Sequence, residues 1–168
     1  LQINYGAGNR VEFKLASRTD APPVTDTYFE VKTTKRLKSI LVYTDTNTPA
    51  RAYKLTYTYS SGSSKSILTG IQQYGDNFTT DTSGTVTGGS SLPPTTMVWS
   101  TTDKANWFGS APLVLEINSP LGSTTMVDYE PYSISLPFTL QTVSSITSTS
   151  NQGHSATQTY TYEGGSYD

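Results

Sequence analysis

The stretch Lys54-Leu55-Thr56-Tyr57-Thr58-Tyr59 decides the fold class, because an apolar or aromatic side chain occupies every second position. Successive side chains of a β-strand point to opposite faces of the sheet. Leu55, Tyr57 and Tyr59 therefore share one face, and the Lys and Thr residues share the other. The alternation returns at residues 157–162. Both stretches predict β-strands in which one face is more apolar than the other.

The same period of two extends over most of the chain, and no helical stripe longer than two turns is visible in the sequence. Residues 113–117 are expected to turn Leu113, Leu115 and Ile117 inward. Residues 36–44 are apolar on both faces, which predicts a central strand. The other predicted strands are residues 9–16, 28–33, 66–74, 95–100, 124–129 and 140–148. The side chains expected to be mostly buried are Leu37, Ile40, Leu41, Leu55, Tyr57, Ile71, Leu115, Ile117, Val143 and Ile146.

Turn-forming residues separate these strands. Gly, Pro, Asn, Asp and Ser gather at residues 45–49, 60–64, 118–122 and 151–153, which are predicted to be hairpin loops. Residues 79–91 are rich in Gly, Ser and Thr and are predicted to be a long flexible loop. The pattern predicts an all-β protein with antiparallel sheets of hairpins, either sandwich-like or an open strip. Residues 1–168 are expected to form a single β domain.

The composition excludes several classes of protein. The chain has 168 residues, of which 14% are charged, and its formal net charge is −2 without a basic block, so nucleic-acid binding is not expected. Without Cys there is no disulfide framework and no thiolate metal site, and no metal or other cofactor is expected. No apolar run is long enough for a membrane-spanning helix. The high Ser and Thr content favours a secreted or cell-surface bacterial protein.

The residues with potential for catalysis do not form a recognisable motif. His154 is the only His, and it lies in a predicted turn without an adjacent carboxylate or nucleophile. Asp128 and Glu130 have the spacing of paired carboxylates on one strand face, but solvent exposure explains them better. Asp45 with Asn47, and Asp76 with Asn77, could offer oxygen ligands to calcium, although a turn-stabilising role is favoured. We therefore expect no catalytic and no metal-binding residues.

Two further clusters allow a binding function. Trp107 and Phe108 are adjacent in a predicted loop, and with Trp99 they suggest a site where sugar rings stack on aromatic side chains. Packing in the core is the favoured explanation of these aromatics. Residues 32–38 contain four basic side chains and could bind phosphate or anionic lipid, but a solvated strand face is favoured. The sequon at Asn77 leaves glycosylation open.

Several segments, taken in order, resemble the YD-repeat proteins, also called RHS proteins, and most closely the B components of bacterial insecticidal toxin complexes and their SpvB-like relatives. The segments that carry the resemblance are Arg36 to Ile40, Arg51 to Tyr57, Ser66 to Gly75, Ser91 to Thr96 with Trp99, Asn118 to Tyr129, Leu136 to Phe138, Val143 to Thr147 and Tyr160 to Asp168.

The resemblance implies a scaffold. In that family, long antiparallel sheets spiral into a hollow shell around a toxic C-terminal segment, and this chain would be an early strip of the shell. The family often carries a β-propeller between the segments that correspond here to residues 91–99 and 118–129. Only residues 100–117 lie between them in this chain, so docking through a propeller cannot be carried over. The family's aspartyl self-cleavage motif is also missing from this chain.

Three hypotheses follow. The first is a non-enzymatic structural β-scaffold segment of a secreted RHS/toxin-B-like protein. The second is an extracellular filament or surface subunit that uses strand complementation, with residues 1–15 as the donated strand. The third is a carbohydrate-binding β-module. In the first two, the partners are neighbouring strands of the same or another chain. The segments expected near the sheet edges are residues 9–16 and 157–162, which either pair with another chain or are covered by a terminal strand that folds back.

Overall fold

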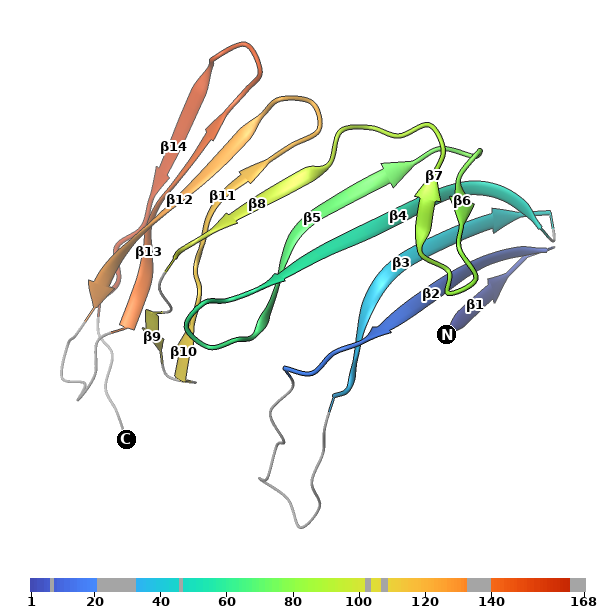
Figure 1. The fold of residues 1–168 in the computed structure, drawn as a ribbon. Helices are drawn as coiled ribbons and strands as arrows, with labels where there is room; N and C mark the ends of the chain where they lie inside the picture. Colours follow the sequence, from blue (N-terminus) through green and yellow to red (C-terminus); the bar gives the residue numbers. More distant parts are fainter. Residues whose placement is uncertain are drawn as a thin grey trace. The chain divides into compact units, whose positions relative to one another are not determined.

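The computed structural model describes residues 1–6, 8–20, 33–45, 47–101, 104–106, 109–132 and 140–163. All regular elements of these residues are β-strands, and the sheets are antiparallel (Figure 1), which confirms the predicted fold class. The chain divides into two compact units. Unit 1 comprises Leu1–Thr58 and Leu68–Pro94, and unit 2 comprises Tyr59–Ile67 and Thr95–Asp168. The expected single domain over residues 1–168 stays a prediction.

Unit 1 is built on consecutive antiparallel strands that neighbour one another in chain order. They are β1 (Gln2–Tyr5), β2 (Asn9–Ser17), β3 (Lys35–Thr44), β4 (Thr48–Tyr59) and β5 (Ser66–Tyr74). The predicted hairpin loops at residues 45–49 and 60–64 join β3 to β4 and β4 to β5. The predicted strand at residues 28–33 lies almost wholly outside the described residues. Local alternation and turn chemistry are therefore sufficient to place most strands of this unit.

A short hairpin replaces the long flexible loop that the sequence predicts at residues 79–91. Strand β6 (Thr79–Thr80) pairs with β7 (Val86–Gly88), and the hairpin lies over one face of the unit 1 sheet (Figure 1). Each strand is only two or three residues long. Such strands are too short to display an alternation, so the Gly, Ser and Thr content dominates the sequence pattern.

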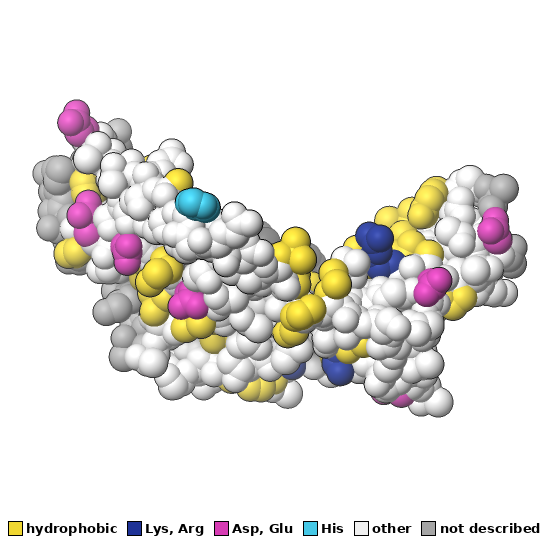
Figure 2. All heavy atoms as spheres, turned by 90° about the horizontal axis from the view of Figure 1, so that it is seen from above, with side chains coloured by type: hydrophobic (Ala, Val, Ile, Leu, Met, Phe, Trp, Pro, Cys, Tyr) yellow, Lys and Arg dark blue, Asp and Glu magenta, His cyan; other side chains and the backbone are white. Residues whose placement is uncertain are grey.

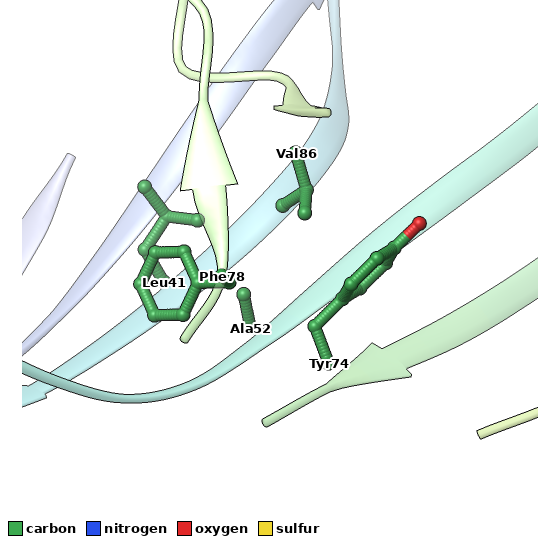
Figure 3. Packing of buried hydrophobic residues seen from close by; sticks show 5 residues of the cluster. All are labelled: Leu41, Ala52, Tyr74, Phe78 and Val86. Carbon is green, nitrogen blue, oxygen red and sulfur yellow. The ribbon is translucent and has the colours of Figure 1, made fainter. Parts of the chain in front are cut away.

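The buried core of unit 1 lies between this hairpin and the sheet. It consists of Leu41, Ala52, Tyr74, Phe78 and Val86, and Figure 3 shows Phe78 and Val86 beside Leu41 and Ala52. Leu41 and Ala52 are directly paired across β3 and β4, so their side chains share one face. The ring of Tyr43 packs edge-on against Phe78, with 5.6 Å between ring centroids. The hairpin and the residue just before it thus supply two of the five core residues, Val86 and Phe78.

Unit 2 contains a second run of antiparallel strands in the order β8 (Thr95–Trp99), β11 (Val114–Asn118), β12 (Thr124–Tyr132), β13 (Leu140–Thr149) and β14 (Ser155–Thr159). Strands β9 (Lys104–Asn106) and β10 (Gly109–Ala111) pair with each other in a separate hairpin. The loops predicted at residues 118–122 and 151–153 join β11 to β12 and β13 to β14.

Burial differs between the units. In the described part of unit 2, no hydrophobic side chain is fully buried. Figure 2 shows that hydrophobic side chains reach the molecular surface on the face in view, with few charged side chains around them. The predicted core residues Ile117, Val143 and Ile146 are half-buried, as are those predicted in unit 1 apart from Leu41, which is fully buried. A strand pattern identifies the more apolar face, but full burial also needs a second layer over that face.

The prediction for Leu115 is wrong. Its side chain is 38% exposed, because a β-bulge between Val114 and Glu116 interrupts the pairing of β11 with β8. An extra residue in one strand shifts the side-chain alternation on either side of it. Leu113 and Ile117, which the alternation placed with Leu115, are half-buried.

Candidate functional site

The charged side chains of β2 form one cluster on the hairpin-covered face of unit 1. Arg10, Glu12 and Lys14 occupy alternate positions, and Glu12 pairs with Leu41 across β2 and β3. Arg10 Nε and Lys14 Nζ each lie 2.8 Å from a Glu12 carboxylate oxygen. The hydrogen bond from Lys14 is the largest influence on Glu12, and together with Arg10 it holds the pKa of the carboxyl below its usual value although burial acts to raise it.

Arg10 connects this cluster to the core. Its guanidinium lies 3.9 Å from the centre of the Tyr43 ring, and Nη1 donates a hydrogen bond to Asn47 Oδ1 at 3.0 Å. Burial raises the pKa of Tyr43. The side chain of Asn47 thus joins the β3–β4 turn to Arg10. The preference for a turn-stabilising role over calcium binding stays a prediction. The cluster positions the β3–β4 turn against the sheet.

The hairpin turn is held by Asp81. Its Oδ1 accepts hydrogen bonds from the backbone N–H groups of Ser83 and Thr85, at 2.8 and 2.9 Å, and from the Ser83 hydroxyl at 2.7 Å. These bonds, with that from the Ser83 hydroxyl the strongest influence, lower the pKa of Asp81 to about 2. The exposed carboxylate therefore fixes the turn that carries the buried Val86.

This arrangement predicts a pH dependence of stability. The pKa of Asp81 falls from 3.8 to about 2 on folding, so its contribution is fully present above pH 3.8 and is lost as the pH falls toward 2. When the pH is lowered from about 5 to about 2, the melting temperature of Asp81→Asn should therefore fall less than that of the wild type. The fall for Ser83→Ala should lie between the two. Thermal unfolding followed by circular dichroism checks this. Equal slopes for all three proteins would contradict it.

The basic residues 32–38 do not form one open anion site. Lys32 lies outside the described residues. Lys35 donates to Ser17 Oγ at 2.9 Å, and the Arg36 guanidinium lies 4.7 Å from the centre of the Tyr57 ring. Lys38 Nζ donates to Ser83 Oγ at 2.7 Å and lies 3.2 Å from Thr85 Oγ1. Lys38 therefore helps to hold the β6–β7 hairpin on the sheet.

Two carboxylates of unit 2, those of Asp128 and Glu116, accept hydrogen bonds from neighbouring polar side chains. Asp128 Oδ2 accepts from the Ser145 hydroxyl at 2.8 Å, and both Asp128 and Glu130 are exposed on β12. Glu116 Oε1 accepts from Asn118 Nδ2 at 2.6 Å, and Asn118 in turn accepts from Thr124 at 2.8 Å. Among the described residues, no group of three or more acidic or His side chains could hold a metal ion.

His154 lies in the turn between β13 and β14, as predicted, and is exposed. It borders an open groove of about 430 Å³ on unit 2. The other lining residues are Ser123, Thr124, Thr125, Ser148, Thr149, Ser150, Ser155 and Ala156. A His acting as general base is usually oriented by a carboxylate, and none lines this groove. The groove offers hydroxyl groups rather than an acid–base pair.

The aromatic site is only partly visible. Trp99 ends β8, pairs with Val114 of β11 and is half-buried. Trp107 and Phe108 lie outside the described residues, so the carbohydrate-binding hypothesis stays a prediction. Asn77 is exposed, but its amide already accepts from Ser90 N–H at 2.8 Å and donates to Ser90 Oγ at 2.9 Å.

Sequence reasoning missed the Arg10–Glu12–Lys14 cluster. The signal that reveals it is the alternation of charge sign at every second residue of a predicted strand, which places opposite charges side by side on one face. It also missed the Asn77–Ser90 contact, for which no local signal exists, because the two residues are joined only when the hairpin folds.

The comparisons with known proteins identify one region. Residues 77–168 match the family described as the insecticide toxin TcdB middle/N-terminal region, and the match covers more than half of the chain. Neither the curated proteins nor the solved structures contain a significant match. In the part of the chain that the structure describes, no helix has the length and apolar character needed to cross a membrane.

Proposed function

The chain belongs to the family of the insecticide toxin TcdB middle/N-terminal region, and we propose that it serves there as a non-enzymatic structural β-scaffold segment of a secreted, RHS-type toxin-complex protein. The observation that carries the proposal is the family match over residues 77–168. The resemblance of the hairpin array to YD-repeat shells supports the finer assignment.

The geometry of unit 1 supports a structural role. Its charged clusters are directed inward or along the sheet: Glu12 binds Arg10 and Lys14, and Lys38 binds the β6–β7 turn. Their interactions connect the hairpin, the β3–β4 turn and the sheet. Ion pairs and hydrogen bonds of this kind stabilise a fold, and they support a structural role for these charged side chains.

The proposal is tested by comparing the toxicity of variants that change exposed polar side chains with the toxicity of variants that weaken the buried core. In toxin complexes assembled with a TcdB-type protein that carries this segment, His154→Ala, Asp128→Asn and Glu130→Gln should leave toxicity within about twofold of the wild type. These side chains are exposed, and such surface changes usually alter stability by less than about 0.5 kcal/mol. Variants of the buried core should reduce toxicity in proportion to their loss of melting temperature.

The opposite pattern would overturn the scaffold role. A loss of toxicity in His154→Ala or Glu130→Gln, with an unchanged melting temperature and intact assembly, would show that a polar side chain carries chemistry. Assembly is measured by size-exclusion chromatography with light scattering, so that a failure to assemble is separated from a failure to act.

A further inference from the structure

The β6–β7 hairpin is carried by a segment whose two ends meet at one place on the unit 1 sheet. Gly75 N–H donates a hydrogen bond to Ser90 O at 2.8 Å. Tyr74 and Ser91, the residues next to this bond, form an antiparallel bridge. Residues 75–90 therefore leave the sheet and return to it at a single base, as the two ends of an Ω-loop do.

Contacts within the base keep it closed. Asn77 accepts a hydrogen bond from Ser90 N–H at 2.8 Å and donates one to Ser90 Oγ at 2.9 Å. The two legs of the segment also touch here, because a Cβ at Gly89 would lie 2.7 Å from Phe78 Cα. Phe78 itself packs on Tyr43. These contacts join the base to itself or to the sheet, so they do not depend on where the hairpin beyond the base lies.

Beyond the base, residues 79–88 have little apolar contact with the sheet. Val86 is the one hydrophobic residue in this stretch, and its side chain is fully buried. Residues 79–83 are exposed. Segments with few buried apolar contacts open locally at a lower cost in free energy than the core strands do.

A β-bulge in β3 aims a lysine at the turn of this hairpin. Lys14, on the hairpin-covered face, pairs with Ser39, and Leu15 pairs with Leu37, so Lys38 is an extra residue between two paired positions. In a regular strand Lys38 would lie on the face opposite to Ser39, away from the hairpin. A bulge re-aims a side chain, and the Lys38 side chain here reaches the hairpin turn.

Two lysines hold that turn on the sheet. Lys38 Nζ donates to Ser83 Oγ at 2.7 Å and lies 3.2 Å from Thr85 Oγ1. The methylene groups of Lys14 lie directly beneath Gly84, because a Cβ added to Gly84 would be 2.7 Å from Lys14 Cγ. Together these contacts of Lys38 and Lys14 with the turn form the latch.

We propose that residues 79–88 form a strap that opens and closes as one unit over the unit 1 sheet. The base is its hinge, and the latch is its closing contact. In the open state the latch is broken and Val86 leaves the core, while the base and the pairing of β2, β3 and β4 remain. Opening uncovers Leu41 and Ala52, so unit 1 exposes apolar surface without unfolding its sheet. The strap does not depend on the proposed scaffold role.

Ser39 offers a position for a probe of this opening. Its side chain is fully buried, its cross-strand neighbour Lys14 supports Gly84, and its chain neighbour Lys38 binds Ser83. Within the described residues, Ser39 Oγ has no hydrogen-bond partner. Ser39→Cys therefore replaces oxygen by sulfur without removing a bond of these residues, in a chain that has no other Cys. The thiol is covered when the strap is closed and accessible when it is open.

The measurement is the rate at which Ser39→Cys in the intact chain reacts with dithionitrobenzoate, at urea concentrations below the unfolding transition. If the strap opens alone, this rate should change little with urea, because a short hairpin exposes little surface when it opens. Thr87→Cys places a thiol at an exposed position of the strap and gives the rate for an uncovered thiol. The ratio of the two rates gives the fraction of open strap.

Variants of the latch decide whether the strap is the moving part. In the Ser39→Cys background, Lys38→Met keeps the length of the side chain and loses the charged donor, so labelling should become about threefold to tenfold faster. Val86→Ala should accelerate it by about tenfold or more, since apolar burial is lost. The matched control is Lys35→Met. Lys35 is on the same strand but donates to Ser17 within the sheet, so its loss should change the rate by less than about twofold.

Two results would overturn the strap. One is a labelling rate that follows global unfolding, measured by circular dichroism, in every variant. The other is an equal effect of Lys38→Met and Lys35→Met. If Ser39→Cys does not fold, Ala52→Cys repeats the measurement at a second fully buried small residue, in the same cluster as Val86 (Figure 3). Neither result bears on toxicity, which tests the scaffold role separately.

Discussion

Replacing Phe78 with Ala is expected to lower the free energy of unfolding by about 3–5 kcal/mol. The ring is 7% exposed and packs edge-on against Tyr43 in the small cluster beneath the hairpin. Its loss removes apolar burial and leaves a cavity that few neighbours can fill, because the cluster contains only four other buried hydrophobic residues. Chemical denaturation followed by tyrosine fluorescence measures the change.

The matched control for this substitution is Leu121→Ala. Leu121 is 73% exposed in the β11–β12 loop, so its truncation should change the free energy of unfolding by less than about 0.5 kcal/mol. A loss below about 1 kcal/mol for Phe78→Ala would mean that the β6–β7 hairpin contributes little to the core of unit 1. That outcome would contradict the packing in Figure 3.

Gly89→Ala should have a comparable effect for a different reason. Gly89 has a φ of +122°, and a Cβ there would lie 2.7 Å from Phe78 Cα and 2.9 Å from Asn77 O. Backbone atoms cannot move aside as a flexible side chain can. Backbone strain of about 1–3 kcal/mol therefore adds to overpacking of about 1–3 kcal/mol. We expect a total loss of about 3–5 kcal/mol in denaturant unfolding.

Gly153→Ala separates the two causes. Gly153 has a φ of +83°, but no atom lies within 4 Å of its hypothetical Cβ, so only the conformational cost of about 1–2 kcal/mol applies. Equal losses at Gly89 and Gly153 would remove the steric argument. Phe78→Ala combined with Gly89→Ala should cost less than the sum of the single changes, because both act by detaching the same hairpin.

These expectations bear on the proposed scaffold. The family match begins at Asn77, immediately before the buried Phe78, and includes the whole β6–β7 hairpin. The hairpin and the preceding Phe78, which supply two of the five buried core residues of unit 1, are therefore part of the family's own region. If the role is structural, substitutions here should affect function more than substitutions of any exposed acid or of His154.

The candidate site was predictable only in part. The turn position of His154 and the exposure of Asp128 and Glu130 follow from local sequence, because a predicted turn or a strand's wet face places a side chain without reference to distant residues. The engagement of Lys38 by the turn at Ser83 could not be predicted, since 45 residues separate them. A contact of that separation depends on how the hairpin lies on the sheet.

The sequence by itself determined most of the longer strands and the turns between them. Alternating side chains at residues 54–59 and turn residues at 45–49, 60–64, 118–122 and 151–153 are local properties, because a strand's period and a loop's backbone angles depend on neighbouring residues. Only the tertiary structure decided which faces are covered. Val86 is fully buried within a segment that otherwise has the composition of a loop, and Leu115 is exposed within an apolar strand. Burial depends on a second layer and on bulges that shift the alternation, and neither is encoded in the pattern of a single strand.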